Sequence, residues 1–298
     1  MIGRLHHPAG TLADDGFDVR LTPETAGWGW SGLMVLSLGE GEERSMVLDG
    51  VEAMVLPLGI TGVQVEVDDE VFGVRGRTSV FDRVSDFVYA PLGATLRLTA
   101  STAGDVAIAT SRCEQRHPAA YGAAESVRVD VFGAGPATRQ RNALMAPEAW
   151  TGADRLMCVE LLTPDGNWSS YPPHRHDDSP ECPVNNEEIY YFRIGAVEGR
   201  DASTAFGMHR TYTPEGDIDE NVVVRDGDVF CVPRGYHGPC IAAPGYPMYY
   251  LNVLAGPSGE RSMAFCDDPA HHWVRDTWAH MARDPRVPMT DHQGRRTP

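Results

Sequence analysis

Residues 168–177 have the sequence WSSYPPHRHD, and the histidine pair near its end is the most informative feature of the chain. Residues two apart in a β-strand project to the same face, so His174 and His176 can both reach one ion while Arg175 points away. Pro172 and Pro173 oppose a helix just before the pair. The stretch therefore predicts a strand that presents two imidazoles at one point.

Two later stretches carry residues that could complete a metal site. Residues 225–237, RDGDVFCVPRGYH, indicate a turn, a buried strand and a second Pro/Gly turn that delivers His237. Residues 186–193, NEEIYYFR, place Glu187 and Glu188 at the start of an aromatic, β-branched strand. Three imidazoles and one carboxylate suit zinc, manganese, iron or nickel, and the set does not choose among them.

Strand signals dominate the rest of the chain. Short apolar runs, for example at 33–38, 63–67, 157–162 and 248–253, alternate with Gly, Asp and Pro turns, which is typical of an all-β barrel or sandwich. This pattern of short apolar runs and turns occurs twice, on either side of a polar, Gly/Pro-rich stretch at 133–142. We therefore expect two copies of one β domain, at 1–132 and 145–283. Because the first has only scattered histidines, we expect it to lack metal ligands.

Composition excludes several classes of function. A formal charge of −17 argues against nucleic acid or an anionic membrane as a partner. The chain contains no lysine, so Schiff-base chemistry and a P-loop are excluded, and any acidic substrate must be held by arginine. No apolar run approaches the roughly 20 residues of a membrane span, and the start lacks a signal-peptide pattern. We expect a cytoplasmic protein.

The ligand spacings resemble a known family. His174-x-His176, a following glutamate and Gly227-x5-Pro233-x-Gly235-x-His237 resemble the two cupin motifs. The sequence departs from the standard cupin motifs in two places: the inserted loop 177–186 and the single residue between Gly235 and His237. Both departures resemble the 5-deoxy-glucuronate isomerase family of bacterial myo-inositol catabolism. The matching stretches are 163–174, 187–191, 232–237, 245–257 and 267–269.

The resemblance implies a bicupin, two jelly-roll barrels of which the second holds one divalent metal through His174, His176, Glu188 and His237. Glu188 is preferred over Glu187 because the carboxylate just before the Ile-Tyr-Tyr strand matches a ligand in related uronate isomerases. Zinc or manganese is the preferred metal, with iron or nickel as alternatives.

The family's reaction converts 5-deoxy-glucuronate, an aldehyde at C1, to 5-dehydro-2-deoxy-gluconate, a ketone at C2. The metal would act as a Lewis acid, with either a proton shuttle or a hydride shift. The candidates for the base are Glu187, His209, Tyr191 and Tyr249. The candidates for binding the uronic-acid carboxylate are Arg193, Arg210 and Arg234, and Arg234 is favoured because its turn also delivers His237.

Two other functions remain open from the residues alone. One is a cupin dioxygenase that uses iron or nickel on a small acid, since the same ligand set holds those metals. The other is a non-enzymatic sugar-binding bicupin. A homo-oligomer formed through edge strands is compatible with either.

Overall fold

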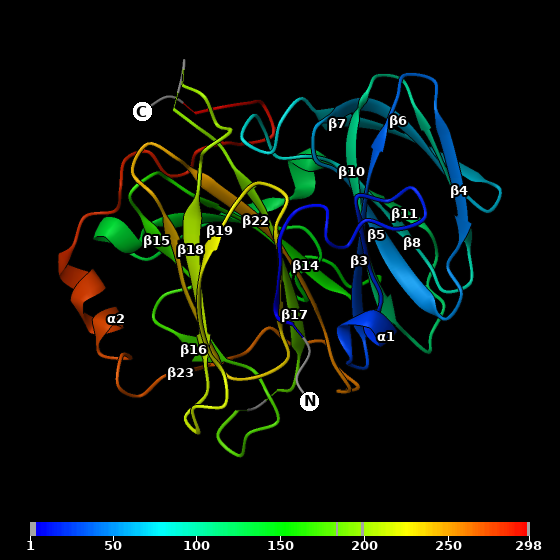
Figure 1. Ribbon diagram of the computed structural model, residues 1–298. Helices are drawn as coiled ribbons and strands as arrows, with labels where there is room; N and C mark the ends of the chain where they lie inside the picture. The colour runs from blue at the N-terminus through cyan, green and yellow to red at the C-terminus, as the bar shows by residue number, and fades with distance from the viewer. Residues whose placement is uncertain (1–3, 183, 198–199, 297–298) are drawn as a thin grey trace.

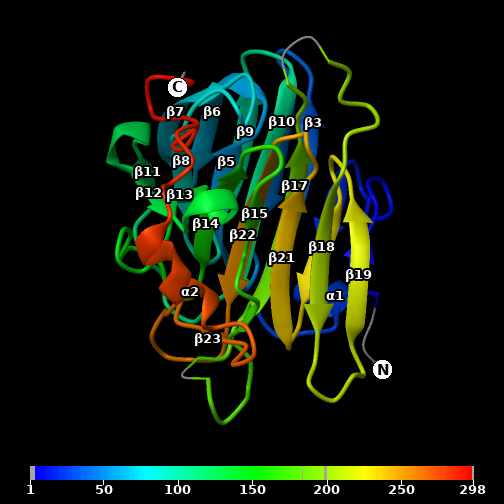
Figure 2. The same ribbon diagram turned by 90° about the vertical axis from the view of Figure 1, so that its left-hand side faces the viewer.

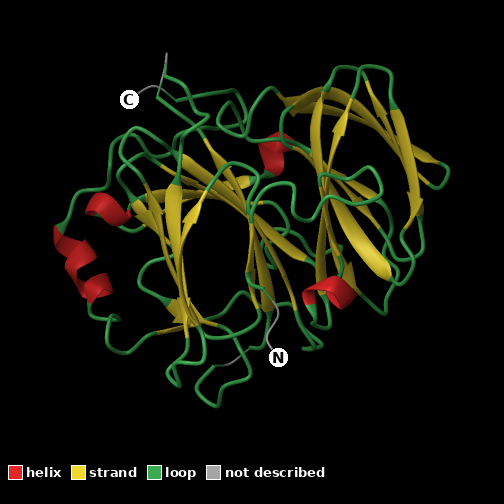
Figure 3. Cartoon of the chain, viewed as in Figure 1, coloured by secondary structure: helices red, strands yellow, loops and turns green. Residues whose placement is uncertain are grey.

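The computed structural model describes residues 4–182, 184–197 and 200–296, and nearly all of its regular structure is β-strand (Figures 1 and 3). The described helices are single turns: α1 (Pro23–Ala26), α2 (Val274–Thr277) and the 3-10 turns η1 (Ala124–Ser126), η2 (Gly135–Ala137) and η3 (Trp278–His280). The expected all-β class is confirmed. No helix within these residues is both long and apolar enough to cross a membrane.

The first half is a sandwich of two antiparallel sheets. The inner sheet has the order β11-β8-β5-β10-β3-β2 and the outer sheet β4-β9-β6-β7. Val, Leu and Ile side chains from both sheets form the core between them. The strands of the inner sheet are β2 (Val19–Leu21), β3 (Ser31–Leu38), β5 (Val51–Pro57), β8 (Phe87–Ala90), β10 (Gly104–Arg112) and β11 (Ala120–Gly122). Those of the outer sheet are β4 (Glu43–Val47), β6 (Ile60–Val67), β7 (Glu70–Arg77) and β9 (Thr95–Ala100).

The second half packs a seven-stranded sheet, here called the central sheet, against a six-stranded barrel sheet (Figure 2). The central sheet has the order β1-β20-β17-β22-β14-β13-β12, and the barrel sheet runs β19-β18-β21-β16-β23, with β15 also paired to β21. The central strands are β1 (His6–His7), β12 (Arg128–Phe132), β13 (Arg139–Ala143), β14 (Met157–Thr163), β17 (Glu187–Ile194), β20 (Val229–Val232) and β22 (Met248–Ala255). The barrel strands are β15 (Trp168–Ser169), β16 (His174–Arg175), β18 (Gly207–Tyr212), β19 (Asp219–Val224), β21 (Tyr236–Ala242) and β23 (Cys266–Asp267).

The central sheet is covered on both faces. Strands β14 and β22 are buried at every position, as expected for segments that are apolar without alternation. One face packs on the barrel sheet through Tyr190, Phe192 and Tyr250, among others. The other face packs on the inner sheet of the first half, and Ile189, Tyr191 and Tyr249 belong to this third core. Odd-numbered and even-numbered residues of the same strand therefore lie in different cores.

Strands from both ends of the first half join the central sheet. Strand β1 pairs with β20, and β12 pairs with β13, although both precede the Gly/Pro-rich stretch predicted to separate the domains. That stretch contains four of the five residues of β13. The division at 1–132 and 145–283 stays a prediction, and this pairing shows how closely the two halves are woven together.

Buried polar contacts reinforce the packing between the halves. Arg77, at the end of β7, forms an ion pair with Glu160 of β14, and both side chains are fully buried. Glu160 also accepts hydrogen bonds from Tyr249 Oη at 2.8 Å and Asn142 Nδ2 at 2.9 Å. Glu52 of β5 accepts three backbone N–H groups from residues 154–156 at 2.6–2.9 Å. Every one of these carboxylates is satisfied, as burial requires.

Replacing Glu160 with leucine should destabilise the fold strongly, because it leaves the Arg77 guanidinium buried without its carboxylate. We expect a loss of about 3–5 kcal/mol in the free energy of unfolding, measured by urea denaturation. The combined Arg77→Met and Glu160→Leu protein should recover most of it. Asp14→Ala, which breaks an exposed pair with Arg20, should cost less than about 1 kcal/mol. Equal losses for Glu160→Leu and Asp14→Ala would contradict this reading.

Candidate metal centre

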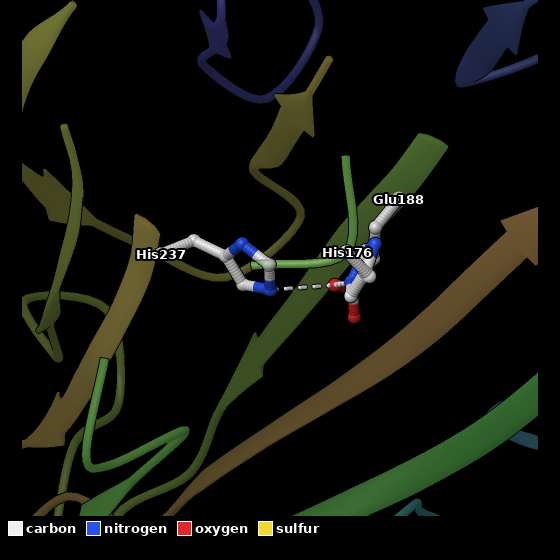
Figure 4. A group of neighbouring side chains, drawn as sticks. All are labelled: His176, Glu188 and His237. Atoms are coloured by element: carbon white, nitrogen blue, oxygen red, sulfur yellow. Dashed lines mark hydrogen bonds and ion pairs between the residues drawn. The ribbon is translucent and has the colours of Figure 1, made fainter. Parts of the chain in front are cut away.

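Three buried side chains converge inside the second barrel (Figure 4). They are His176, just after β16, Glu188 on β17 and His237 on β21, and their ligating atoms all lie within 4.8 Å of one another. The Glu188 Oε2 atom is 2.9 Å from His176 Nε2 and 3.0 Å from His237 Nε2. The cluster thus links the two sheets of the barrel, since β17 lies in the central sheet and β21 in the barrel sheet.

Backbone carbonyls orient the imidazoles. The Nδ1 atom of His176 lies 3.0 Å from Asn186 O, and that of His237 lies 3.2 Å from Gly235 O. His174 has the same arrangement, with Nδ1 3.2 Å from Pro172 O. A carbonyl oxygen only accepts, so Nδ1 donates in each ring and Nε2 is left to face the cluster. This is how proteins prepare histidine to bind a metal. Against the effect of burial, the hydrogen bond to Glu188 raises the pKa of His176, and a metal bound at its Nε2 would displace the proton there.

His174 lies beside the cluster but is not a member of its tight group. Its ring centroid is 4.5 Å from that of His237 and 6.4 Å from that of His176. The backbone of β16 pairs His174 directly with His237 across the barrel sheet. The structure therefore brings three of the four predicted ligands together and places the fourth next to them.

Burial and charge act on the protonation of these groups in opposite directions. Burial would raise the pKa of Glu188, but its contacts with His176 and His237 outweigh that effect and hold the pKa well below its usual range. Burial, together with the neighbouring His237, lowers the pKa of His174 well below its ordinary value. Glu188 is therefore ionised and His174 neutral at physiological pH, which are the protonation states of metal ligands.

One buried nitrogen supports the fit of a cation. His237 Nε2 is buried, lies 3.0 Å from Glu188 Oε2 and has no assigned hydrogen-bond partner among the described residues. A buried imidazole nitrogen beside an ionised carboxylate suits a divalent metal. These donors, two or three imidazole nitrogens and one carboxylate, fit a transition-metal site.

A cavity of about 200 Å³ opens beside the cluster. It is smaller than the roughly 300–1,000 Å³ of pockets for drug-sized ligands, so it suits a small molecule. Its lining combines the ligands with hydroxyl, amide, guanidinium and aromatic groups. The side chains that matter below are Phe132, Arg139, Arg141, Ser170, His174, His176, Glu188, Tyr190, Tyr250, Asn252, Arg275 and Trp278.

Glu187, a predicted base, lies on the opposite face of β17 from the cluster. Its carboxylate accepts hydrogen bonds from the backbone N–H groups of Gly29, Trp30 and Ser31 at 2.6, 2.9 and 3.0 Å. Those residues belong to the first half. Neighbouring residues on a strand point to opposite faces, so a ligand at 188 directs 187 away from the site. Glu187 is an anchor between the halves and is not positioned to act as a base.

Tyr191, Tyr249 and Arg193 lie on the same far face. Tyr191 and Tyr249 belong to the core between the halves, and Tyr249 Oη donates to Glu160. The Arg193 guanidinium pairs with Asp105 at 3.1 Å and Asp226 at 3.0 Å. None of the three lines the cavity beside the cluster. The structure does not support their predicted roles as bases or as a substrate-binding arginine.

His209, Arg210 and Arg234 also lie away from the cavity. His209 is fully buried between aromatic rings, its Nε2 2.9 Å from Thr211 Oγ1, and burial lowers its pKa to about 3, so it is a neutral core histidine. Arg210 is 3.5 Å from Asp219 on the surface, and Arg234 is paired with Asp217. Their predicted roles in base catalysis and carboxylate binding are not supported.

Sequence reasoning missed the residues that do line the cavity. Three of them point to the same face of the central sheet as Glu188: Tyr190, Tyr250 and Asn252. In the pairing of β17 with β22, Glu188 lies opposite Leu254 and Tyr190 lies opposite Asn252. Counting in steps of two from Glu188 would have found Tyr190 in place of Tyr191. Arg139 and Arg141 were missed because they lie in or next to the stretch interpreted as a linker.

Comparison with known proteins agrees with this architecture. A family model described as the KduI/IolB family matches residues 5–274. A protein of Geobacillus kaustophilus named 5-deoxy-glucuronate isomerase is 38% identical over 281 residues, 93% of this chain and 97% of its own. A protein of the same name from Bacillus subtilis is 34% identical over 245 residues, covering 80% of this chain and 86% of its own.

Solved structures give the same picture. The crystal structure of an IolB-like protein from Salmonella typhimurium superposes with a TM-score of 0.82 and 29% identity, over 91% of this chain and 99% of its own. Oxalate decarboxylase of Lactobacillus farciminis superposes with a TM-score of 0.62 over 87% of this chain and 88% of its own, at 10% identity, a likeness of fold alone.

Two joined β domains, with a buried His/Glu cluster in the second, define a bicupin, as expected from the sequence. Within that class the match over most of the chain is specific. The chain belongs to the KduI/IolB family. The resemblance to the 5-deoxy-glucuronate isomerase family is confirmed.

Alanine substitutions at the two adjacent glutamates should separate the ligand from the anchor. Glu188→Ala should lower metal content per chain, measured by elemental analysis after gel filtration, because it removes the only carboxylate in the cluster. Glu187→Ala should keep its metal but lose about 1–3 kcal/mol of stability, since three partly buried backbone N–H groups lose their acceptor. Metal loss in Glu187→Ala with retention in Glu188→Ala would reverse the assignment.

Proposed function

We propose that the chain is a metal-dependent aldose–ketose isomerase that converts 5-deoxy-glucuronate to 5-dehydro-2-deoxy-gluconate in inositol catabolism. The observation that carries the proposal is the buried His176–Glu188–His237 cluster in a chain with two relatives, each 38% identical over nearly its whole length, that bear the isomerase name. A cytoplasmic location and a homo-oligomer belong to the same proposal.

His174, His176, Glu188 and His237 would hold one divalent transition metal, preferably zinc or manganese, with iron or nickel as alternatives. Bound there, the metal would supply Lewis-acid polarisation of the substrate's C1 and C2 oxygens. The protein prepares for this by keeping Glu188 ionised and His174 neutral, as described above. Apolar side chains such as Val159 and Leu254 line the same cavity.

The cavity offers a chain of hydroxyl groups that could carry a proton. Ser170 Oγ lies 2.9 Å from Tyr250 Oη and 3.3 Å from Tyr190 Oη. Burial raises the pKa of both tyrosines, and the charge of Glu188 adds to the effect at Tyr190, so both hydroxyls stay protonated at neutral pH. Apart from the ligand residues, the described lining contains no carboxylate and no other histidine. We therefore assign the proton that moves from O2 to O1 to Tyr250, Ser170 and Tyr190, whose neutral hydroxyls accept and donate it in one relay, while the C2 hydrogen passes to C1 as hydride.

Neither alternative function is favoured. The relatives found by sequence similarity carry the isomerase name, and the likeness to oxalate decarboxylase extends to the fold only. A sugar-binding protein without catalysis would not need to keep three metal-ligating side chains buried around an ionised carboxylate.

Purified protein loaded with zinc or manganese should interconvert 5-deoxy-glucuronate and its ketose, followed by proton NMR without added oxidant. Dialysis against a chelator should abolish the activity, and adding the metal back should restore it. Full activity in protein shown by elemental analysis to be metal-free would refute the metal's role. Oxygen consumption in place of isomerisation would favour a dioxygenase.

Adjacent tyrosines on β22 allow a matched test of the hydroxyl chain. Tyr250→Phe should lower kcat about 10²-fold or more while metal content stays unchanged, because the ring remains and only the proton carrier is lost. Tyr249→Phe, on the far face, should keep kcat and lose about 1 kcal/mol of stability through its bond to Glu160. Equal kcat values in the two variants would remove Tyr250 from the mechanism.

A further inference from the structure

One cationic side chain in the cavity has no counter-charge. Arg139, on β13, is only 8% exposed and lines the same cavity as the metal cluster. Its Nη1 donates to Ala137 O at 3.0 Å, and its Nε is buried without a hydrogen-bond partner. Burial lowers the pKa of Arg139 to about 10, a value at which it still carries its charge at neutral pH.

The other two arginines of the cavity are already paired. Arg141 lies 2.6 Å from Asp130 and 2.8 Å from Glu148. Arg275 makes two contacts with the carboxylate of Asp267, at 2.5 and 2.7 Å. No acidic residue among those described lies within ion-pair distance of Arg139. The free positive charge of the cavity is therefore concentrated at one guanidinium.

Aromatic rings hold Arg139 in place without neutralising it. Its guanidinium carbon is 5.8 Å from the ring centre of Phe132 and 5.7 Å from that of Trp278. Such contacts orient a cation but recover only part of the cost of burying it. A second polar group of the lining, the buried Asn252 Nδ2, also has no hydrogen-bond partner. Two unsatisfied donors in one small cavity indicate a site prepared for an anion.

The strand order sets the distance between this anion site and the metal cluster. Within the central sheet, β13 is three strands away from β17, which carries Glu188, so their axes are separated by about 14 Å. Arg139 and Glu188 line one cavity from these two strands. The arrangement suits a short-chain acid whose reacting end and carboxylate lie at opposite ends, as C1 and C6 do in a uronic acid.

We propose that Arg139, assisted by Asn252, binds the carboxylate of the substrate and thereby directs its C1–C2 end to the metal cluster. The identity of the substrate rests on the function proposed above, whereas the anion site does not. Arg139 is then the residue that selects an acid over the corresponding neutral sugar. This assigns to Arg139 the role that sequence analysis expected of Arg193, Arg210 or Arg234.

The kinetic test replaces Arg139 with methionine, which keeps the packing between the two rings and removes the charge. The KM for 5-deoxy-glucuronate should rise on the order of 10- to 100-fold, as expected for loss of a charged hydrogen bond, with metal content unchanged. Turnover of 5-deoxy-glucose, which has a hydroxymethyl group in place of the carboxylate, should be slow in the wild type and unaltered in the variant. Arg128→Met, at an exposed arginine on neighbouring β12 outside the cavity, is the matched control and should change neither substrate's kinetics.

A binding test separates the anion site from the proposed reaction. Calorimetric titration of metal-loaded protein with D-gluconate and with sorbitol, the same open chain without a carboxylate, should show at least a tenfold preference for the acid in the wild type. Arg139→Met should lose that preference. If the preference is present but 5-deoxy-glucuronate is not isomerised, the anion site stands and the proposed function fails.

The melting temperature of the variant distinguishes a ligand-binding arginine from one that only stabilises the fold, since loss of the latter would lower it. Because the buried charge is uncompensated in ligand-free protein, Arg139→Met should melt at the same or a higher temperature than the wild type. A variant that keeps its preference for gluconate would overturn the proposal, whatever its melting temperature. So would a wild-type protein that binds gluconate and sorbitol equally well.

Discussion

The alternation of side chains along the central sheet is the constraint on which the rest of the structure depends. Because the inner strands β14, β17, β20 and β22 are buried on both faces, each of them must supply two different environments from successive residues. Even-numbered positions of β17 and β22 line the barrel, and odd-numbered positions pack on the first half. At positions 187 and 188 the two roles are adjacent: one glutamate holds the halves together, and the next belongs to the metal cluster.

The fold and the centre of the site could be predicted from the sequence because both depend on local patterns. Two-residue spacing puts His174 and His176 on one face, and a Pro/Gly turn delivers His237; these signals lie within a few residues of the ligands. The all-β class likewise follows from short apolar runs between turns. The finer choice of Glu188 over Glu187 came from family resemblance, and the opposite directions of the two side chains agree with it.

The surroundings of the site could not be predicted because they depend on pairing between distant strands. Tyr191, Tyr249 and Arg193 were candidate site residues, yet each points to the face of the central sheet opposite to Glu188. Arg139 was overlooked for a different reason. Its stretch is rich in glycine and proline and resembles a linker, but β13 forms hydrogen-bonded pairs with β12 and β14 and contributes a wall of the cavity. Only the pairing of strands in the sheet shows that this segment is a strand lining the cavity and not a linker.

The interlocked halves also bear on how such a protein can evolve. The first half contributes no side chain to the metal cluster, yet it packs on one face of the central sheet and receives the Glu187 carboxylate on its backbone. Strands β1 and β12 extend the central sheet from segments that flank the first half in the chain. Gene fragments encoding the catalytic barrel could therefore not be exchanged freely with those of other bicupins. A substitution on the face of the central sheet that packs on the first half must be compatible with the side chains it contacts there, so the two halves are constrained to evolve together.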